Sequence, residues 1–516
     1  MNDRTVSVTG RAEANTTCYT QTTSIAQALV LALALSALAG CAVGPDFARP
    51  ATPAVAGYLA EPAVLPGAGA ADAAQHLQWG ANLDQRWWTA FESPPLDDTV
   101  ARAIADSPTL DTARATLAQA QQAIRVARGG LYPQVDLDAS AERDRARSLR
   151  AGSAGNTTSN LLSVGPTVSY ALDLFGGTRR EIEAQTALAE YQRDQLAAAY
   201  LTLTGNTVTQ ALIAAGAREQ LRAVDDIIAL DRRNIELVSI EREVGKAALA
   251  DLLAAQAQLA ADLALSPPLA QQLSAAEHAL AILVGATPAQ WQPPSFDFVM
   301  LTLPADIPVT LPSAWLAQRP DVRAAEAQLH AASAAIGVAT AQLYPHVTLS
   351  AAWTQSASSM GPLFDAANGL WAVAAQLTAP LFHGGALRAQ KQAAVDAFRA
   401  QLGVYRQTVL QAFGQVADTL RALQHDAEEL AAQRAALDAA QRSLSLLQES
   451  YRVGTASLVD VLQAQRLYAQ ARLGYARAKG QRYVDTAQWY AAMGGSAQAW
   501  AHDQAAVSEN GSAPGH

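Results

Sequence analysis

The sequence has few of the residues that point to disulfides, metal chemistry or nucleic-acid binding. Its 516 residues include two cysteines, Cys18 and Cys41, and eight histidines that are scattered without metal-ligand spacing. The formal net charge is −10, whereas a nucleic-acid-binding protein normally carries a basic face. No glycine-rich phosphate loop and no nucleophile elbow is present. We therefore expect neither an enzyme nor a nucleic-acid-binding protein, and we expect no metal and no cofactor.

Long hydrophobic runs are also missing after the N-terminal region. The mature chain has no stretch of about 18 apolar residues, which excludes a transmembrane helix. The apolar segment at 25–38 is too short to span a bilayer and is typical of a signal peptide. It runs into LAGC at 38–41, which resembles the cleavage site of a bacterial lipoprotein. We predict a signal peptide at 1–40 and a covalent lipid on Cys41; the alternative is a cysteine that follows a signal peptide by chance.

A short sequence motif that occurs twice predicts the strands of this protein. LYPQVDLDAS at 131–140 returns as LYPHVTLSAA at 343–352. After each proline, apolar and polar residues alternate, as they do in a β-strand with two unlike faces. The apolar positions are Val135, Leu137, Ala139 and Ala141 in the first copy and Val347, Leu349, Ala351 and Trp353 in the second. The polar positions are Gln134, Asp136 and Asp138 in the first copy and His346, Thr348 and Ser350 in the second.

The repeat extends over most of the chain. Segment 106–133 matches segment 318–345. Pro108 aligns with Pro320 and Pro133 aligns with Pro345, and the two residues of each pair are 212 positions apart. Each copy continues with a second strand, at 162–177 and at 370–385, that ends on a Gly-Gly pair. We predict β-hairpins at about 133–175 and about 345–382, and the polar stretch 147–160 is predicted to be the loop of the first.

Two very long helices follow the hairpins. The segments at about 178–243 and about 386–452 contain no proline, and at about 1.5 Å per residue each reaches roughly 100 Å. Heptad spacing in both predicts a coiled-coil-like seam between helices. The seam residues are Leu221, Val224, Ile228, Ile235 and Val238 in the first helix and Leu423, Leu430, Leu437, Leu444 and Tyr451 in the second.

Five segments follow from these patterns. After the signal peptide, 41–95 is predicted to be a lipidated tether, and the family resemblance described below implies that it ends in an equatorial contact segment. Residues 96–309 form the first repeat with its return helix and connector, and 310–495 form the second. Residues 496–516 are polar and are predicted to be a flexible tail.

Four alternating strands cannot complete a membrane barrel in one chain. An open sheet edge is not tolerated in lipid, and four strands are too few to close a barrel of useful size. If the strands span a membrane, three chains with four strands each would share a barrel of twelve. The alternative reading of the alternation is a soluble antiparallel sheet with one wet face.

The order of these features resembles the outer membrane factor family of TolC-like efflux channels, in its NodT-type lipoprotein branch. The resemblance is carried by CAVGPDFARP at 41–50, RWWTAFESPPLDD at 86–98, the two LYP strands, LFGG and LFHGG, and two VG turns. It implies an α+β membrane protein with an internal two-fold repeat. A homotrimer would form a twelve-stranded β-barrel in outer-membrane lipid and a long α-helical coiled-coil barrel in the periplasm. A periplasmic adaptor and an inner-membrane pump would be its partners.

The resemblance also assigns roles to residues around the two VG turns. Val244, Gly245, Lys246, Val453, Gly454 and Thr455 match the tips that contact the adaptor. For each glycine alone, the alternative is an ordinary helix C-cap. The acidic pore constriction of the family maps onto Asp460 and Gln463, and Gln463 departs from the acidic pattern, which puts a second ring of charge in doubt. A gate hydrogen bond is expected from Tyr451 to Asp251. For Asp251 and Asp460, the alternative is an acid in the first turn of a helix, where the dipole favours it.

The sequence therefore predicts an outer-membrane exit duct of a tripartite efflux system that passes drugs or other small molecules. One alternative is a duct for protein secretion or metal export, although the lack of methionine or histidine clusters argues against copper or silver. Another is a periplasmic coiled-coil lipoprotein without a pore, which would leave the four alternating strands unexplained.

Overall fold

The computed structural model describes residues 42–51, 55, 57–61, 75–81, 83–148 and 155–494. The predicted signal peptide, Cys41 and the tail at 496–516 lie outside the described residues. The chain forms two compact units, and each takes segments from both halves of the sequence. Of the described residues, the strand unit takes those within Met1–Ala48, Gln122–Ala187 and His330–Ala400, and the helical unit takes those within Arg49–Gln121, Leu188–Leu329 and Gln401–His516.

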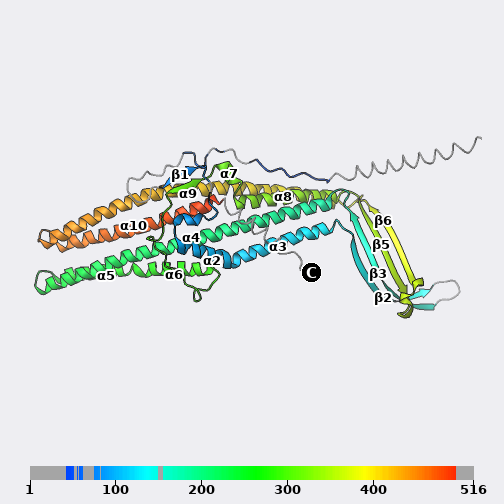
Figure 1. The fold of residues 1–516 in the computed structure, drawn as a ribbon, viewed down its shortest axis with the longest axis horizontal. Helices are drawn as coiled ribbons and strands as arrows, with labels where there is room; N and C mark the ends of the chain where they lie inside the picture. Colours follow the sequence, from blue (N-terminus) through cyan, green and yellow to red (C-terminus); the bar gives the residue numbers. More distant parts are fainter. Residues whose placement is uncertain are drawn as a thin grey trace, which may run out of the picture. The chain divides into compact units, whose positions relative to one another are not determined.

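The strand unit contains a four-stranded antiparallel sheet in the order β2-β3-β5-β6, whose strands lie side by side in Figure 1. Helix α3 ends shortly before β2, and α8 ends shortly before β5. Pro133 and Pro345 directly precede these strands, because a proline lacks the N–H donor that a ladder position inside the strand would need. The elements are α3 (Pro108–Gly129), β2 (Gln134–Ser148), β3 (Gly155–Leu172), α8 (Pro320–Ala341), β5 (His346–Ala357) and β6 (Gly369–Thr378).

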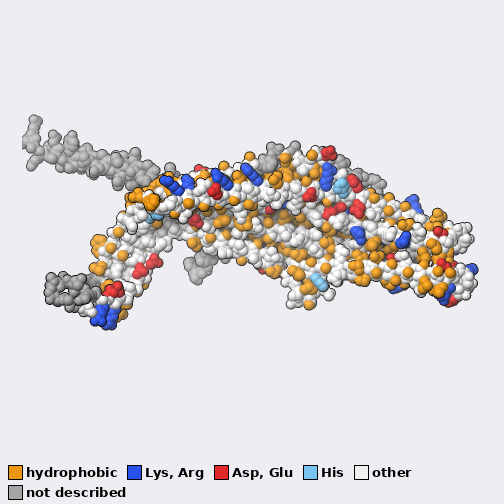
Figure 2. Space-filling model, turned by 180° about the vertical axis from the view of Figure 1, so that it is seen from behind, with side chains coloured by type: hydrophobic (Ala, Val, Ile, Leu, Met, Phe, Trp, Pro, Cys, Tyr) orange, Lys and Arg blue, Asp and Glu red, His pale blue; other side chains and the backbone are white. Residues whose placement is uncertain are grey.

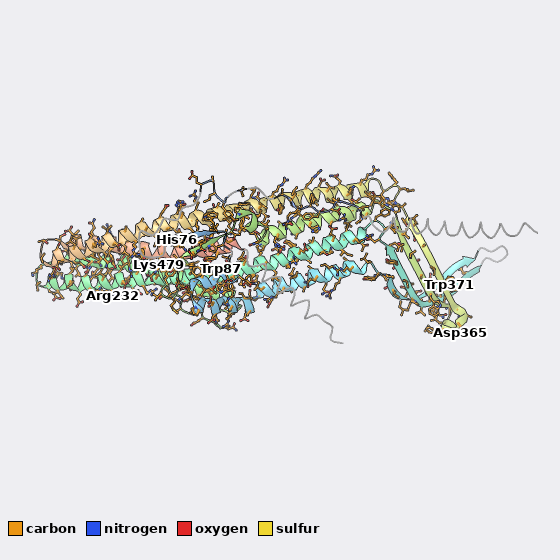
Figure 3. All side chains as sticks on the ribbon, turned by 45° about the horizontal axis from the view of Figure 1, so that its top comes forward. His76, Trp87, Arg232, Asp365, Trp371 and Lys479 are labelled. Atoms are coloured by element: carbon orange, nitrogen blue, oxygen red, sulfur yellow. The ribbon has the colours of Figure 1, made fainter. Side chains whose placement is uncertain are left out.

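The strand register gives the sheet one apolar and one polar face. Val135 pairs with Val168 and Ala139 with Val164, whereas Asp136 pairs with Thr167 on the other face. Apolar side chains stay exposed in the single chain: 78% of Trp371, which Figure 3 labels on β6, and 74% of Leu137 are accessible. Further exposed apolar side chains on this face are Val135, Leu349, Trp353, Val373 and Leu377, whereas Leu370 pairs with Thr354 on the other face. The sheet thus shows the alternation that the sequence predicts.

The first hairpin departs from the predicted strand limits. The loop expected at 147–160 is largely strand, since β2 continues to Ser148 and β3 begins at Gly155. Arg145 pairs with Thr158 and Arg143 with Asn160, so backbone pairing overrides the Gly/Ser/Asn-rich composition of this stretch. The second strands also end earlier than predicted, at Leu172 and Thr378, and the Gly-Gly pairs lie outside the ladder. In Figure 2, charged side chains gather at the loop end of the sheet.

The helical unit is organised by two helical hairpins (Figure 1). The long helices are α4 (Gly177–Glu243) and α9 (Ala386–Arg452), against expected spans of 178–243 and 386–452; both begin in the strand unit. Each turns into a return helix, α5 (Leu249–Leu263) or α10 (Leu458–Met493). The predicted seam positions are buried where they meet neighbouring helices, as the apolar stripe of a packed helix requires. Buried seam residues are Val224, Ile228, Val238, Leu423, Leu437 and Leu444.

Aromatic side chains around the C-terminal end of α10 form a second core of the helical unit. Trp87, labelled in Figure 3, stacks on Tyr490 with ring centroids 5.6 Å apart. The Nε1 atom of Trp489 donates to the carbonyl oxygen of Pro308 over 3.1 Å, and that of Trp315 donates to the carbonyl of Ala492 over 3.3 Å. The RWWTAF segment and the connector therefore both contact the C-terminal end of α10.

Short elements complete the two units. In the helical unit, β1 pairs with β4 in a parallel two-stranded sheet. These elements are β1 (His76–Trp79), η1 (Trp87–Phe91), α2 (Pro94–Asp106), α6 (Ser266–Leu283), β4 (Asp306–Val309) and α7 (Pro312–Leu316); in the strand unit they are η2 (Gly361–Phe364) and η3 (Ala366–Asn368). Among the helices that the structure describes, none is long and apolar enough to cross a membrane.

Candidate functional site

The turn between α4 and α5 exposes the residues that the sequence predicts as the first tip. Gly245 has a φ of 74°, a left-handed conformation that favours glycine. Its N–H donates to the carbonyl of Arg242 over 3.0 Å, and the N–H of Lys246 donates to Glu241 over 2.7 Å. These bonds satisfy carbonyls at the helix end, so the turn is well defined while the Val244 side chain remains 64% exposed.

The turn between α9 and α10 repeats this geometry. Gly454 has a φ of 82°, and its N–H donates to the carbonyl of Tyr451 over 3.0 Å. The N–H of Thr455 donates to Ser450 over 2.8 Å, and the Val453 side chain is exposed. Both glycines therefore have the geometry of an ordinary helix C-cap, which was the alternative to the adaptor-contact role. They also present equivalent, exposed turn backbone, which the adaptor-contact prediction requires.

Asp460 and Gln463 lie at neighbouring exposed positions of α10. They are three residues apart on one helix, so their side chains share a face of its first turns. Asp460 Oδ2 accepts from the Ser457 backbone N–H over 2.9 Å and from the Ser457 hydroxyl over 2.6 Å, and its own N–H donates to that hydroxyl oxygen over 3.2 Å. The Ser457 hydroxyl and then the Ser457 N–H hold the pKa of Asp460 below its usual value. The carboxylate is therefore both a helix cap and an exposed negative charge.

The predicted gate hydrogen bond is not the one that this structure contains. The Tyr451 hydroxyl donates to Oε2 of Glu241 on α4, whereas Asp251 accepts from the N–H of Ala248 in its own helix over 2.9 Å. The pairing of Tyr451 with Asp251 is therefore corrected to Tyr451 with Glu241. Burial, followed by the bond to Glu241, raises the pKa of Tyr451 to about 12. Asp251 is near enough for its charge to contribute, but its carboxylate caps the start of α5.

A set of buried polar contacts between α4 and α10 was missed by the sequence reasoning. The Gln465 amide donates to Asp231 Oδ1 over 2.5 Å, and the Asn234 amide donates to Gln465. Further along the same helices, Arg472 lies 3.3 Å from Asp226. The sequence contained a signal for this contact. Between the seam residues Ile228 and Ile235, the heptad pattern expects another apolar residue, and that position holds Asp231. A polar residue at a seam position marks a specific contact between helices.

The segment that follows Cys41 is held within the strand unit. The N–H of Val43 donates to the carbonyl of Phe175 over 3.0 Å, at the junction of β3 and α4. Arg180 lies 2.7 Å from the Asp46 carboxylate, and the Phe47 ring stacks on His330 with centroids 4.5 Å apart. Residues 42–48 therefore have specific partners beside the point where β3 ends.

The arrangement offers exposed charge and turn backbone rather than reactive groups. Among the described residues, no group of three or more His, Cys, Asp or Glu side chains is placed to hold a metal ion. Near the turns, Asp251 and Asp460 cap helices, and Glu241 joins neighbouring helices. Such a site can act on ions through its charge rather than through covalent chemistry.

Two stretches of the chain match one family model. Residues 99–286 and 311–495 match the family described as outer membrane efflux protein. Because the matched stretches cover more than half of the chain, the protein belongs to the outer membrane efflux protein family. The resemblance to outer membrane factors is confirmed, and so are the location in the bacterial outer membrane and the role in efflux. Proteins of this family are channels rather than enzymes.

Named relatives and a solved structure agree with this assignment. The pyoverdine export outer membrane protein OpmQ of Pseudomonas putida is 32% identical over 425 residues, which cover 81% of this chain and 89% of the relative. The probable efflux pump outer membrane protein TtgC of Pseudomonas putida is 30% identical over 485 residues, 90% of this chain and 95% of the relative. The solved outer-membrane channel OprN gives a TM-score of 0.80 at 27% identity, over 89% of this chain and all of that one.

Proposed function

We propose that three copies of this chain assemble into an exit duct across the outer membrane. The observation that carries the proposal is a four-stranded sheet whose outer strands, β2 and β6, each have a partner on one side only within the described chain. One face of the sheet is apolar and exposed, which suits lipid contact. Pairing β2 of one copy with β6 of the next closes three sheets into a twelve-stranded barrel without an edge. The repeated helical hairpins then form the periplasmic tunnel.

The exposed turns are the proposed docking points for a periplasmic adaptor that connects the duct to an inner-membrane pump. Val244, Gly245 and Lys246 offer one contact, and Val453, Gly454 and Thr455 offer the other. The cargo would be drugs or other small molecules: the relative OpmQ is named for pyoverdine export, and TtgC is named as part of an efflux pump. Cys41 would carry the lipid, and the contacts of residues 42–48 support an anchor held beside the strands.

Asp460 is proposed to form the pore constriction together with Gln463. Three symmetry-related Asp460 carboxylates would make a negative ring that favours cations, and Gln463 would add a polar but neutral ring. Asp251 would support this entrance by capping α5, and the Tyr451–Glu241 bond would hold the two hairpins together in the closed state. The support is the exposed position of Asp460 and Gln463 on one helix face.

Ion selectivity in planar bilayers tests this proposal. Purified protein is expected to run as a heat-labile trimer and to conduct cations in preference to anions. The variant Asp460→Ala should lose most of this preference, whereas Asp438→Ala, which removes an exposed carboxylate in α9, should keep it. Unchanged selectivity in Asp460→Ala would reject the ring, and a monomer that does not conduct would reject the channel.

A further inference from the structure

Two buried carboxyl groups face each other between α4 and α5. Asp231 is 2% exposed and Asp262 is 7% exposed. Oδ1 of Asp231 accepts from Gln465, and Oδ2 of Asp262 accepts from the Gln258 amide over 2.8 Å. Oδ2 of Asp231 is buried and meets no N–H or hydroxyl donor in the described part of the chain. The group within hydrogen-bonding reach is the carboxyl of Asp262.

No cation neutralises this pair among the groups that act on Asp231. Arg232 and Arg233 follow it on α4, but both are exposed and lie on other faces; Figure 3 labels Arg232. From α10 the facing group is the neutral amide of Gln465, while Arg472 reaches Asp226, more than one helical turn away. Two buried carboxylates without a cation repel each other and lose their hydration. A proton between them removes the repulsion and leaves a single buried charge, because one carboxyl then donates its O–H to the carboxylate of the other.

We propose that Asp231 and Asp262 form a proton-binding site that locks α4 to α5 and, through Gln465, to α10. When the proton leaves, two negative charges remain between the helices, so the hairpin contacts loosen. In the assembled duct, which rests on the function proposed above, the loss of this proton would favour opening of the helical end. The ligand of the site is a single proton held by two oxygens.

The electrostatics give the pH range. Burial, followed by the hydrogen bond and charge of Asp262, raises the pKa of Asp231 from 3.8 to about 7. Between these values the folded protein holds a proton that the unfolded chain has released, so the free energy of unfolding falls as pH rises. Above about pH 7 both states have lost the proton and this contribution is constant. The contacts of α4 with α5 and α10 are therefore tight in mild acid and loosen near neutral pH.

A second carboxyl pair, Asp426 with Asp485, provides an internal comparison. Burial, then the hydrogen bond and charge of Asp485, raises the pKa of Asp426 to about 8, and Arg482 acts in the opposite direction. This pair joins α9 to α10 and makes no contact through Gln465. Its protonation will add a separate component to any whole-protein titration, and the variant Asp426→Asn removes it.

Infrared spectroscopy of the purified full chain tests the proton directly. One component of the C=O stretching band of protonated carboxyls should disappear as pH passes about 7, both in the natural protein and in Asp426→Asn. In the natural protein the component of Asp426 should persist to about pH 8. Asp231→Asn should lack this component, because an amide mimics the protonated partner without titrating, and Asp262→Asn should lack it as well. Asp225→Asn, an exposed neighbour on α4, should keep it. If Asp231→Asn retains the component, or if it is missing in the natural protein, the site is refuted.

Bilayer recordings test the consequence for the channel. The open probability of the natural protein should rise severalfold from about pH 6 to about pH 7.5, and it should stay level in Asp231→Asn. An equal rise in Asp231→Asn would overturn the regulatory role. If the infrared component titrates but the protein does not conduct, the proton site stands and the proposed channel function fails. If the protein conducts but no component titrates near pH 7, the channel stands and the proton site fails.

Discussion

The two hairpin turns share a backbone geometry and differ in their side chains. Gly245 and Gly454 both have a positive φ and close their helices with equivalent backbone bonds. At the start of α10, Ser457 and Asp460 bond each other reciprocally. At the start of α5, the equivalent serine position is Ala248, so Asp251 caps the helix through one bond to the Ala248 N–H.

This difference shows which properties the repeat preserves. The turn conformation occurs twice because both long helices must reverse direction within a few residues. The capping hydroxyl and the Asp460–Gln463 face occur on the second turn, whereas Glu241 and the buried Asp231–Asp262 pair belong to the first hairpin. The repeat therefore supplies two similar backbones, and the side chains divide the proposed functions between them.

Replacing the turn glycines should have the largest effect on stability and should affect both turns alike. Gly245→Ala and Gly454→Ala each force a β-carbon into the left-handed region, at a cost of about 1–2 kcal/mol. Thermal unfolding in detergent, followed by circular dichroism, should show similar decreases in both variants. A decrease confined to one variant would mean that the shared geometry is not what stabilises the turns.

Exchanging the capping residue should reduce the difference between the turns. Ser457→Ala removes the hydroxyl that bonds Asp460 and should cost about 1 kcal/mol. Ala248→Ser adds a hydroxyl beside Asp251 and should stabilise α5 by a similar or smaller amount. Thermal unfolding measures both changes. The comparison breaks down if Ala248→Ser is neutral while Ser457→Ala is destabilising, because local geometry would then prevent the new cap.

Removing the Tyr451 hydroxyl should weaken the contact between the hairpins. Tyr451→Phe eliminates the donor to Glu241 and should cost about 0.5–1 kcal/mol, since the site is partly exposed. We expect more frequent opening in bilayer recordings, with ion selectivity unchanged. Glu241→Gln keeps an acceptor and should have a smaller effect. The corrected gate would be rejected if Asp251→Asn, and not Glu241→Ala, reproduced the Tyr451→Phe phenotype.

The smallest expected effect is the acid sensitivity of the second turn. The hydrogen bonds from Ser457 lower the pKa of Asp460 in the folded protein. This contribution to stability is therefore present above the unfolded value of 3.8 and is lost as pH falls through the lowered pKa. Ser457→Ala should raise the pH at which Asp460 titrates, as measured by carboxyl NMR in a selectively labelled sample. No change in that variant would mean that the hydroxyl does not stabilise the carboxylate.

Much of the fold could be read from local sequence patterns. Proline at 133 and 345, alternation in the strands and the absence of proline from the long helices indicated the elements and many of their limits. The predicted helix start at 178 is one residue from the observed Gly177, and the predicted ends at 243 and 452 agree with the observed helices. These features depend on backbone conformation and on burial of one face, which act over a few residues.

The contacts between distant residues were harder to predict. Strand pairing carried β2 and β3 into a stretch whose composition suggested a loop, because each backbone group gains a partner from the other strand. The identity of the Tyr451 partner depends on which turn of α4 lies opposite α9, because Glu241 and Asp251 of the first hairpin are both near enough to act on its hydroxyl. The gap in the heptad series at Asp231 was visible, but its meaning required the position of Asp262 on another helix.

The sequence by itself determined the kind of protein: a duplicated unit with alternating strands, long helices and glycine turns, read from periodicities that follow backbone geometry. The tertiary structure alone decided how the charged side chains are used. Burial and the meeting of separate helices select Glu241 for Tyr451 and bring Asp231 against Asp262, because the free energy of a carboxyl group depends on its hydration and on its neighbours. Neither quantity is a property of a local stretch of sequence.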